Sequence, residues 1–127
     1  MLLDSFARLA RADSKFRDIY RQLEAFTGQH TDWKWLDPVI VSKDFPLLDS
    51  FELGAALVGA VERGFLRAKY TVLTPDGVVA PDAFDSPAEI PKTLPDRFEI
   101  IFDTSSQPLV TVFEEAPSNE AKFEAGP

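Results

Sequence analysis

Apolar residues recur at steps of three and four over residues 2–27, the spacing of one face of an α-helix. No proline interrupts this run, and Gly28 follows it where a C-terminal cap belongs. The pattern predicts one helix about 38 Å long, with the charged pair Asp13 and Arg17 on its polar face. Its apolar stripe consists of Leu2, Phe6, Leu9, Ala12, Phe16, Ile19, Leu23 and Phe26.

A second helix is predicted over residues 50–63. Asp49 precedes it as an N-cap, and Gly64 stands at the position of a left-handed C-terminal cap. The alternation over residues 66–73 predicts a strand, and the turn residues 74–77 follow it. The apolar stripe of this helix consists of Leu53, Leu57 and Val61.

The rest of the chain predicts short β elements. The β-branched run of residues 39–41 favours a short strand. Four prolines between residues 80 and 95 exclude a long regular element there. Residues 98–102 and 109–113 read as two strands, and the turn residues between them favour a hairpin.

Residues 31–80 resemble a winged-helix domain. The resemblance rests on a helix ending in Glu62-Arg63-Gly64-Phe65-Leu66 that runs into a strand over residues 67–73, like a recognition helix followed by a first wing strand. In nucleic-acid-binding members that helix enters the major groove with basic or amide side chains. Here Arg63 is its one basic residue, and it has no Asn or Gln for base edges. The resemblance implies the fold without the DNA-reading chemistry.

The segment that follows resembles a zinc ribbon without its metal. The two C-x-x-C turns of such a ribbon would sit near residues 73–76 and 94–97, on either side of a proline-rich loop. Neither turn contains cysteine or histidine. The resemblance therefore implies a metal-free relative held together by Phe84, Phe98 and Phe102.

These elements together predict an α+β protein with a long N-terminal helix, a winged-helix-like centre and a small antiparallel β-sheet. We expect a single domain over residues 1–115, because a chain of 127 residues has the usual size of one domain. We expect residues 116–127 to form a flexible acidic tail.

Composition narrows the classes of function. The 45% of hydrophobic residues suffices for a core. Thirteen Lys and Arg against 21 Asp and Glu give a net charge of -8, which opposes attraction to phosphate backbones and to anionic membranes. The acidity lies almost entirely beyond residue 35. No segment reaches the ~20 apolar residues of a membrane span and no signal peptide is recognisable, so we expect a cytoplasmic protein.

Candidate catalytic and metal-binding chemistry is sparse. The chain has no cysteine and one histidine, His30, so thiol chemistry and sites with two histidines are excluded. Neither a nucleophile motif nor a phosphate loop is present. We expect no catalytic residue, no metal and no cofactor, and hence no enzyme. The carboxylate pairs considered are Asp82/Asp85, Asp96/Glu99 and Glu114/Glu115.

The remaining features favour a non-catalytic protein–protein interaction module, an adaptor or small accessory subunit. We expect partner contacts at Phe6, Leu9 and Phe16 on the first helix and at Trp33 and Trp35, because aromatic residues are enriched at interface hot spots. The partner is expected to be a protein, with a basic surface as one possibility, or a second copy bound through the N-terminal helix. Small bacterial proteins of this type often belong to multi-component regulatory or antiviral defence systems.

The alternative function is a winged-helix transcription regulator that binds DNA as a dimer. Arg63, Arg67 and Lys69 would then have to gather on one face and meet phosphates. This hypothesis also draws on the weakly basic strip of the first helix, which consists of Arg8, Arg11 and Lys15.

Overall fold

The computed structural model describes residues 2–30 and 34–116. The chain divides into two compact units, one made of residues 1–67 with 113–127 and the other of residues 68–112. The single domain expected over residues 1–115 stays a prediction. The predicted tail lies outside the described residues except for Ala116, which is buried.

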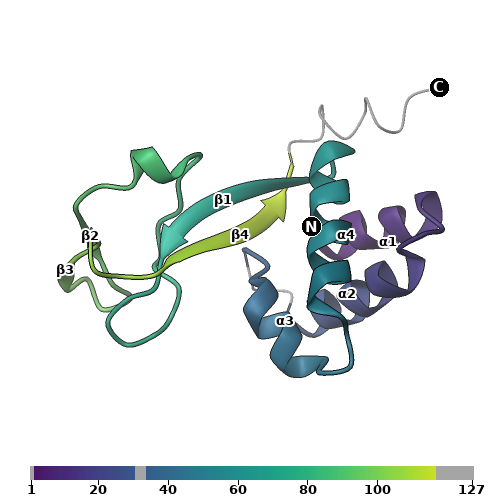
Figure 1. Ribbon diagram of the computed structural model, residues 1–127, viewed down its shortest axis with the longest axis horizontal. Helices are drawn as coiled ribbons and strands as arrows, with labels where there is room; N and C mark the ends of the chain where they lie inside the picture. Colours follow the sequence, from purple (N-terminus) through teal and green to yellow (C-terminus); the bar gives the residue numbers. More distant parts are fainter. Residues whose placement is uncertain (1, 31–33, 117–127) are drawn as a thin grey trace. The chain divides into compact units, whose positions relative to one another are not determined.

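The α-helices of the described residues come first and the short strands follow, as in an α+β protein, so the predicted fold class is confirmed (Figure 1). Strands β1 and β4 pair in one two-stranded sheet, and β2 and β3 pair in another. In the part of the chain that is described, no helix is both long and apolar enough to cross a bilayer. The elements are α1 (Leu2–Ala12), α2 (Arg17–Gln29), α3 (Pro38–Asp44), α4 (Ser50–Glu62), β1 (Leu66–Val72), the short 3₁₀ helix η1 (Pro87–Glu89), β2 (Thr93–Pro95), β3 (Ile101–Asp103) and β4 (Leu109–Glu115).

The single helix predicted over residues 2–27 is wrong, because α1 and α2 are separate helices that pack against each other as an antiparallel hairpin (Figure 1). At the turn, the Arg17 Nε donates to the carbonyl oxygen of Ala10 at 2.8 Å. At the open end, Leu3 lies beside Gly28. The apolar stripe therefore folds back on itself and forms the core of the first unit.

Asp13 accounts for the break between the two helices. Its N–H still bonds to the carbonyl of Leu9 at 2.9 Å, but its Oδ1 accepts the N–H of Lys15 at 3.0 Å. Such local bonding of an aspartate to the backbone competes with continuation of a helix. The Asp13 Oδ2 lies 3.6 Å from a guanidinium nitrogen of Arg63, so Asp13 pairs there and not with Arg17 as predicted.

The strand predicted for residues 39–41 is also wrong, since these residues lie in α3. The Asp37 carboxylate accepts the N–H of Val39 at 2.9 Å, and Pro38 occupies the first helical position. Proline needs no N–H partner there and its φ suits the helix. This capping outweighs the β propensity of the valines and isoleucine.

Helix α4 begins and ends where the sequence predicts. The Asp49 carboxylate accepts two N–H groups of the first turn, the ordinary N-cap arrangement. At the other end Gly64 adopts a φ of 79°, and the N–H of Phe65 bonds back to the carbonyl of Ala60 at 3.0 Å. This Schellman arrangement satisfies the last carbonyls and turns the chain into β1.

A short extended segment after α2 pairs with β4. Leu36 forms an antiparallel bridge with Phe113 of β4, with N–H to carbonyl distances of 2.7 and 2.9 Å. The N–H of Ala116 donates to the carbonyl of Phe65 at 3.0 Å. The order from α2 onward is therefore helix, bridge, helix, helix and β1, and β1 pairs with β4, which follows η1, β2 and β3 in the chain.

The second unit has a small core of its own. Phe84 and Ile90, on the proline-rich loop, pack against this core as half-buried side chains. Phe98, which the zinc-ribbon resemblance placed in the core with Phe84 and Phe102, is instead 62% exposed. The core itself consists of Val72, Ala80, Leu94 and Phe102.

The hairpin predicted between residues 98–102 and 109–113 is wrong. Strand β3 pairs with β2, with Leu94 opposite Phe102, while β4 pairs with β1. The Thr104 hydroxyl donates to the carbonyl of Pro91 at 2.6 Å and fixes the end of this pairing.

Candidate interaction surface

Helix α4 has two faces that are both apolar, although only one of them is buried. The inner face packs against α2 and α3 and consists of Leu53, Ala56, Leu57 and Ala60, each at most 1% exposed. A helix that is apolar all round usually belongs in an interior. The outer face of α4 is therefore the feature of the first unit that needs an explanation.

Tyr20 fixes the inner face of α4 to the helical hairpin. Its hydroxyl donates to the carbonyl of Ala56 at 2.7 Å and lies close to the backbone of Gly59. Burial, together with the charge of Asp13, raises the pKa of Tyr20 to about 12, and the nearby Arg63 charge opposes that rise. Tyr20 therefore stays a neutral donor, and its hydrogen bond fastens α4 to α2.

The outer face of α4 borders an open groove of about 690 Å³. Phe51 and Val58 stand at its edge with 83% and 53% of their surface exposed. The turn between α1 and α2 forms the other wall. We call this surface the α4 groove; its lining consists of Lys15, Phe16, Ser50, Phe51, Gly54, Ala55, Val58, Gly59 and Glu62.

Charged groups lie at both ends of the α4 groove. Glu62 and Lys15 stand at the end where the Asp13–Arg63 ion pair joins the hairpin turn to α4. Exposed Asp49 and Glu52 lie at the N-terminal end of α4. The groove is thus an apolar strip whose two ends differ in charge.

The residues predicted to contact a partner differ in burial. Phe6 and Leu9 are fully buried in the hairpin, so they hold the core and offer no docking surface. Phe16 is half-buried and lines the α4 groove, which agrees with a surface role. Trp33 lies outside the described residues.

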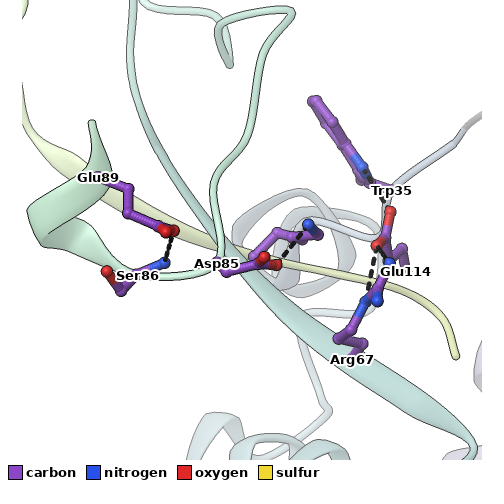
Figure 2. Close-up of polar contacts among 7 residues, drawn as sticks. Trp35, Arg67, Asp85, Ser86, Glu89 and Glu114 are labelled. Atoms are coloured by element: carbon purple, nitrogen blue, oxygen red, sulfur yellow. Dashed lines mark hydrogen bonds and ion pairs between the residues drawn. The ribbon is translucent and has the colours of Figure 1, made fainter. Parts of the chain in front are cut away.

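Trp35 serves an internal contact. Its Nε1 donates to a carboxylate oxygen of Glu114 at 3.3 Å, and the other oxygen of Glu114 accepts from Arg67 at 2.6 and 3.1 Å (Figure 2). Trp35 itself is half-buried, and Lys34 lies over its ring at 5.3 Å. This cluster fastens the segment after α2 to β4.

The three basic residues of the DNA-binding alternative each contact a carboxylate. Arg63 pairs with Asp13, and Arg67 pairs with Glu114. The Lys69 Nζ lies 2.6 Å from a carboxylate oxygen of Asp85 (Figure 2). Charges that are neutralised in this way contribute little to phosphate binding.

Three of the carboxylates considered from the sequence, Asp85, Asp96 and Glu114, serve the local structure. Asp85 and Glu114 form the ion pairs just described, and Asp96 accepts the N–H groups of Phe98 and Ile100 at 2.8 and 2.9 Å. Among the described residues no cluster of three acidic or histidine side chains has the geometry of a metal site. His30 ends α2 with its ring 4.7 Å from that of Phe26.

Phe51 and Val58, the two most exposed apolar residues of the α4 groove, are not among the partner contacts that the sequence predicts. A signal was available, because helix 50–63 is apolar on every side and a helix at the surface should not be. The stripe of Leu53, Leu57 and Val61 drew attention to one face only.

A second exposed apolar surface lies on the second unit. Phe98, Ile100 and Ile101 are each at least 62% exposed at the turn that joins β2 to β3. Glu99 adopts a φ of 65° in this turn, and Arg97 lies over the Phe98 ring at 4.8 Å. Unlike the α4 groove, this surface projects from a short turn.

Comparison of the chain with protein-family models, with curated proteins and with solved structures found no match.

Proposed function

We propose that the protein is a non-catalytic protein–protein interaction module, an adaptor or small accessory subunit, whose contact surface is the α4 groove. One observation carries the proposal, namely an apolar groove lined by one helix and the hairpin turn, with Phe51 83% exposed at its edge. Large apolar side chains that protrude beside a groove are typical of binding sites.

The chemistry of the groove favours an apolar helix of a protein as its occupant. Gly54, Ala55 and Gly59 leave little side chain on the outer face of α4, so a second helix can approach the α4 backbone closely. Phe51 and Phe16 provide aromatic anchors on either side. Charged residues stand only at the ends, as in interfaces with an apolar centre and a polar rim.

The element order supports the winged-helix resemblance. From α2 onward it runs helix, bridge at Leu36, helix, helix and paired strands. In this proposal α4 corresponds to the recognition helix. Its outer face carries Phe51 and Val58 in place of base-reading side chains. In this proposal the helix that would read DNA contacts a protein.

The DNA-binding alternative is the weaker proposal. Arg63, Arg67 and Lys69 each contact a carboxylate within the chain, and the net charge of -8 repels a phosphate backbone. No observation on the outer face of α4 favours it.

Site-specific photo-cross-linking tests the proposed function. A photoreactive amino acid replaces Phe51 or Val58, and in a matched control it replaces Val39, which is 59% exposed on α3. In the cells that make this protein, we expect cross-links to protein from the two α4 positions and far fewer from position 39. Equal cross-linking at all three positions would overturn the proposal.

A further inference from the structure

We propose that the α4 groove is occupied by the α4 helix of a second copy of this chain, with the two helices antiparallel about a twofold axis. This inference rests on the proposed function, since it names the partner of the same surface. It also differs from the dimer predicted through the N-terminal helix, whose apolar residues Phe6 and Leu9 are buried within each copy.

The shape of the outer face is complementary to itself. A twofold axis through the middle of this face places Phe51 opposite Glu62 of the second copy, and Ala55 opposite Val58. Each protruding Phe51 then meets the end of the groove where Phe16 and Glu62 lie. The small residues at the middle allow the two helices to approach closely, and each contact occurs twice, as in any twofold interface.

The charges fit the same arrangement. On α4, Glu52 and Gly59 point to the same side, because they are seven residues apart. Lys15 lies on that side, beside the C-terminal end of the helix. An antiparallel second copy therefore brings its Glu52 toward Lys15, and Lys15 of that copy toward Glu52 of the first. Two symmetry-related Lys15–Glu52 ion pairs therefore close the two ends of the interface.

A parallel pairing lacks these advantages. It would set Phe51 against Phe51. Its twofold axis runs along the helices and places Lys15 and Glu52 of the two copies on opposite sides of the interface, so the ion pairs between the copies would be lost. It would also set the two helix dipoles side by side in the same direction, whereas the antiparallel pairing opposes them. The observations thus favour one orientation.

Charge exchange tests the proposed pairing. Sedimentation velocity over a range of concentrations measures the dimer dissociation constant of the purified full chain. We expect Lys15→Glu and Glu52→Lys each to weaken the dimer roughly tenfold, because each substitution changes two symmetric ion pairs. The double variant K15E/E52K should regain most of the affinity. Absence of rescue would overturn the proposed register.

A substitution at the centre provides a second test. Val58→Asp buries two carboxylates in the interface and should abolish the dimer, whereas Val39→Asp on α3 should leave it intact. Both valines are more than half exposed, so neither variant should unfold the chain, and circular dichroism checks this. A dimer that survives Val58→Asp would contradict the proposal.

Disulfide trapping reads the orientation, because the natural chain contains no cysteine. In the antiparallel dimer, Phe51→Cys mixed with Glu62→Cys should form a mixed disulfide. Glu62→Cys alone should not, because its two copies are displaced by about 16 Å along the helix axis, well beyond the reach of a disulfide. Efficient linkage of Glu62→Cys to itself would indicate the parallel pairing and contradict the proposal.

The outcomes separate the two proposals. If the purified chain stays monomeric at every concentration while positions 51 and 58 cross-link to a different polypeptide, the dimer is wrong and the interaction function stands. If neither a dimer nor a cross-link is found at the α4 groove, both are wrong.

Discussion

Tyr20 shows how one buried hydrogen bond positions the candidate surface. Its hydroxyl donates to the carbonyl of Ala56 at 2.7 Å, and the side chain is fully buried. We expect Tyr20→Phe to lower the free energy of unfolding by about 1 kcal/mol, the usual net value of such a bond. Urea denaturation measures the change. Tyr70→Phe on half-buried β1 is the matched control, and an equal loss in both variants would contradict the assigned role.

The same tyrosine predicts a pH dependence. Its pKa is raised from 10.0 to about 12, chiefly by burial. Below pH 10 the phenol is protonated in both the folded and unfolded states, so its contribution to stability is fully present. Between pH 10 and 12 the unfolded chain releases this proton while the folded protein keeps it, and the contribution is lost as the pH rises. Wild type should therefore lose stability more steeply than Tyr20→Phe over this range; parallel slopes would contradict the raised pKa.

Single residues also explain where the sequence misleads. The helical spacing of Asp13 and Arg17 predicts an ion pair on one helix, but Asp13 bonds to the N–H of Lys15 and pairs with Arg63. In a continuous helix the Asp13 carboxylate would pair with Arg17, whereas in the observed turn it accepts the N–H of Lys15. The choice between them depends on Arg63, which lies fifty positions further along the chain, and local pattern contains no information about that contact.

At the scale of elements, local capping signals were the most reliable. Asp49 and Gly64 bound α4 as the sequence predicts. The same kind of signal was overlooked at Asp37 and Pro38, which start α3. The strand pairing could not be predicted, because the turn near residues 105–108 is compatible with a hairpin while tertiary packing sends β4 to β1.

The N-cap of α4 yields a prediction about this helix. Asp49→Ala removes the side chain that accepts the N–H groups of Phe51 and Glu52 at 2.8 and 3.3 Å. We expect a loss of about 1 kcal/mol in the free energy of unfolding. Asp44→Ala is the control, because Asp44 is the exposed last residue of α3, where a negative charge is unfavourable. Thermal unfolding compares them; a larger loss from Asp44→Ala would refute the assignment.

At the scale of the whole molecule, the candidate surface was predicted only in part. Phe16 lies on it, whereas Phe6 and Leu9 form the core because the predicted helix folds into a hairpin. A helical stripe looks the same whether it faces a partner or its own continuation. The turn of four residues between α1 and α2 therefore determines which apolar side chains are buried and which stay exposed.

The charge of the molecule predicts how it behaves toward DNA. With a net charge of -8 and its three candidate basic residues in contact with carboxylates, the protein should not retard duplex DNA in a gel-shift assay, even at low salt where electrostatic binding is strongest. Retardation that is lost in Arg67→Ala would restore the regulator hypothesis.

Hydroxyl-radical footprinting measures whether a partner covers the outer face of α4. Phe51 and Phe98 are 83% and 62% exposed, so two side chains of the same kind serve as probe and reference. Their oxidation rates are compared between the dilute purified chain and the chain in an extract of the cells that make it. The account predicts that the Phe51 rate falls severalfold in the extract relative to the Phe98 rate. An unchanged ratio, with Phe51 oxidised as fast as in the dilute protein, would contradict it.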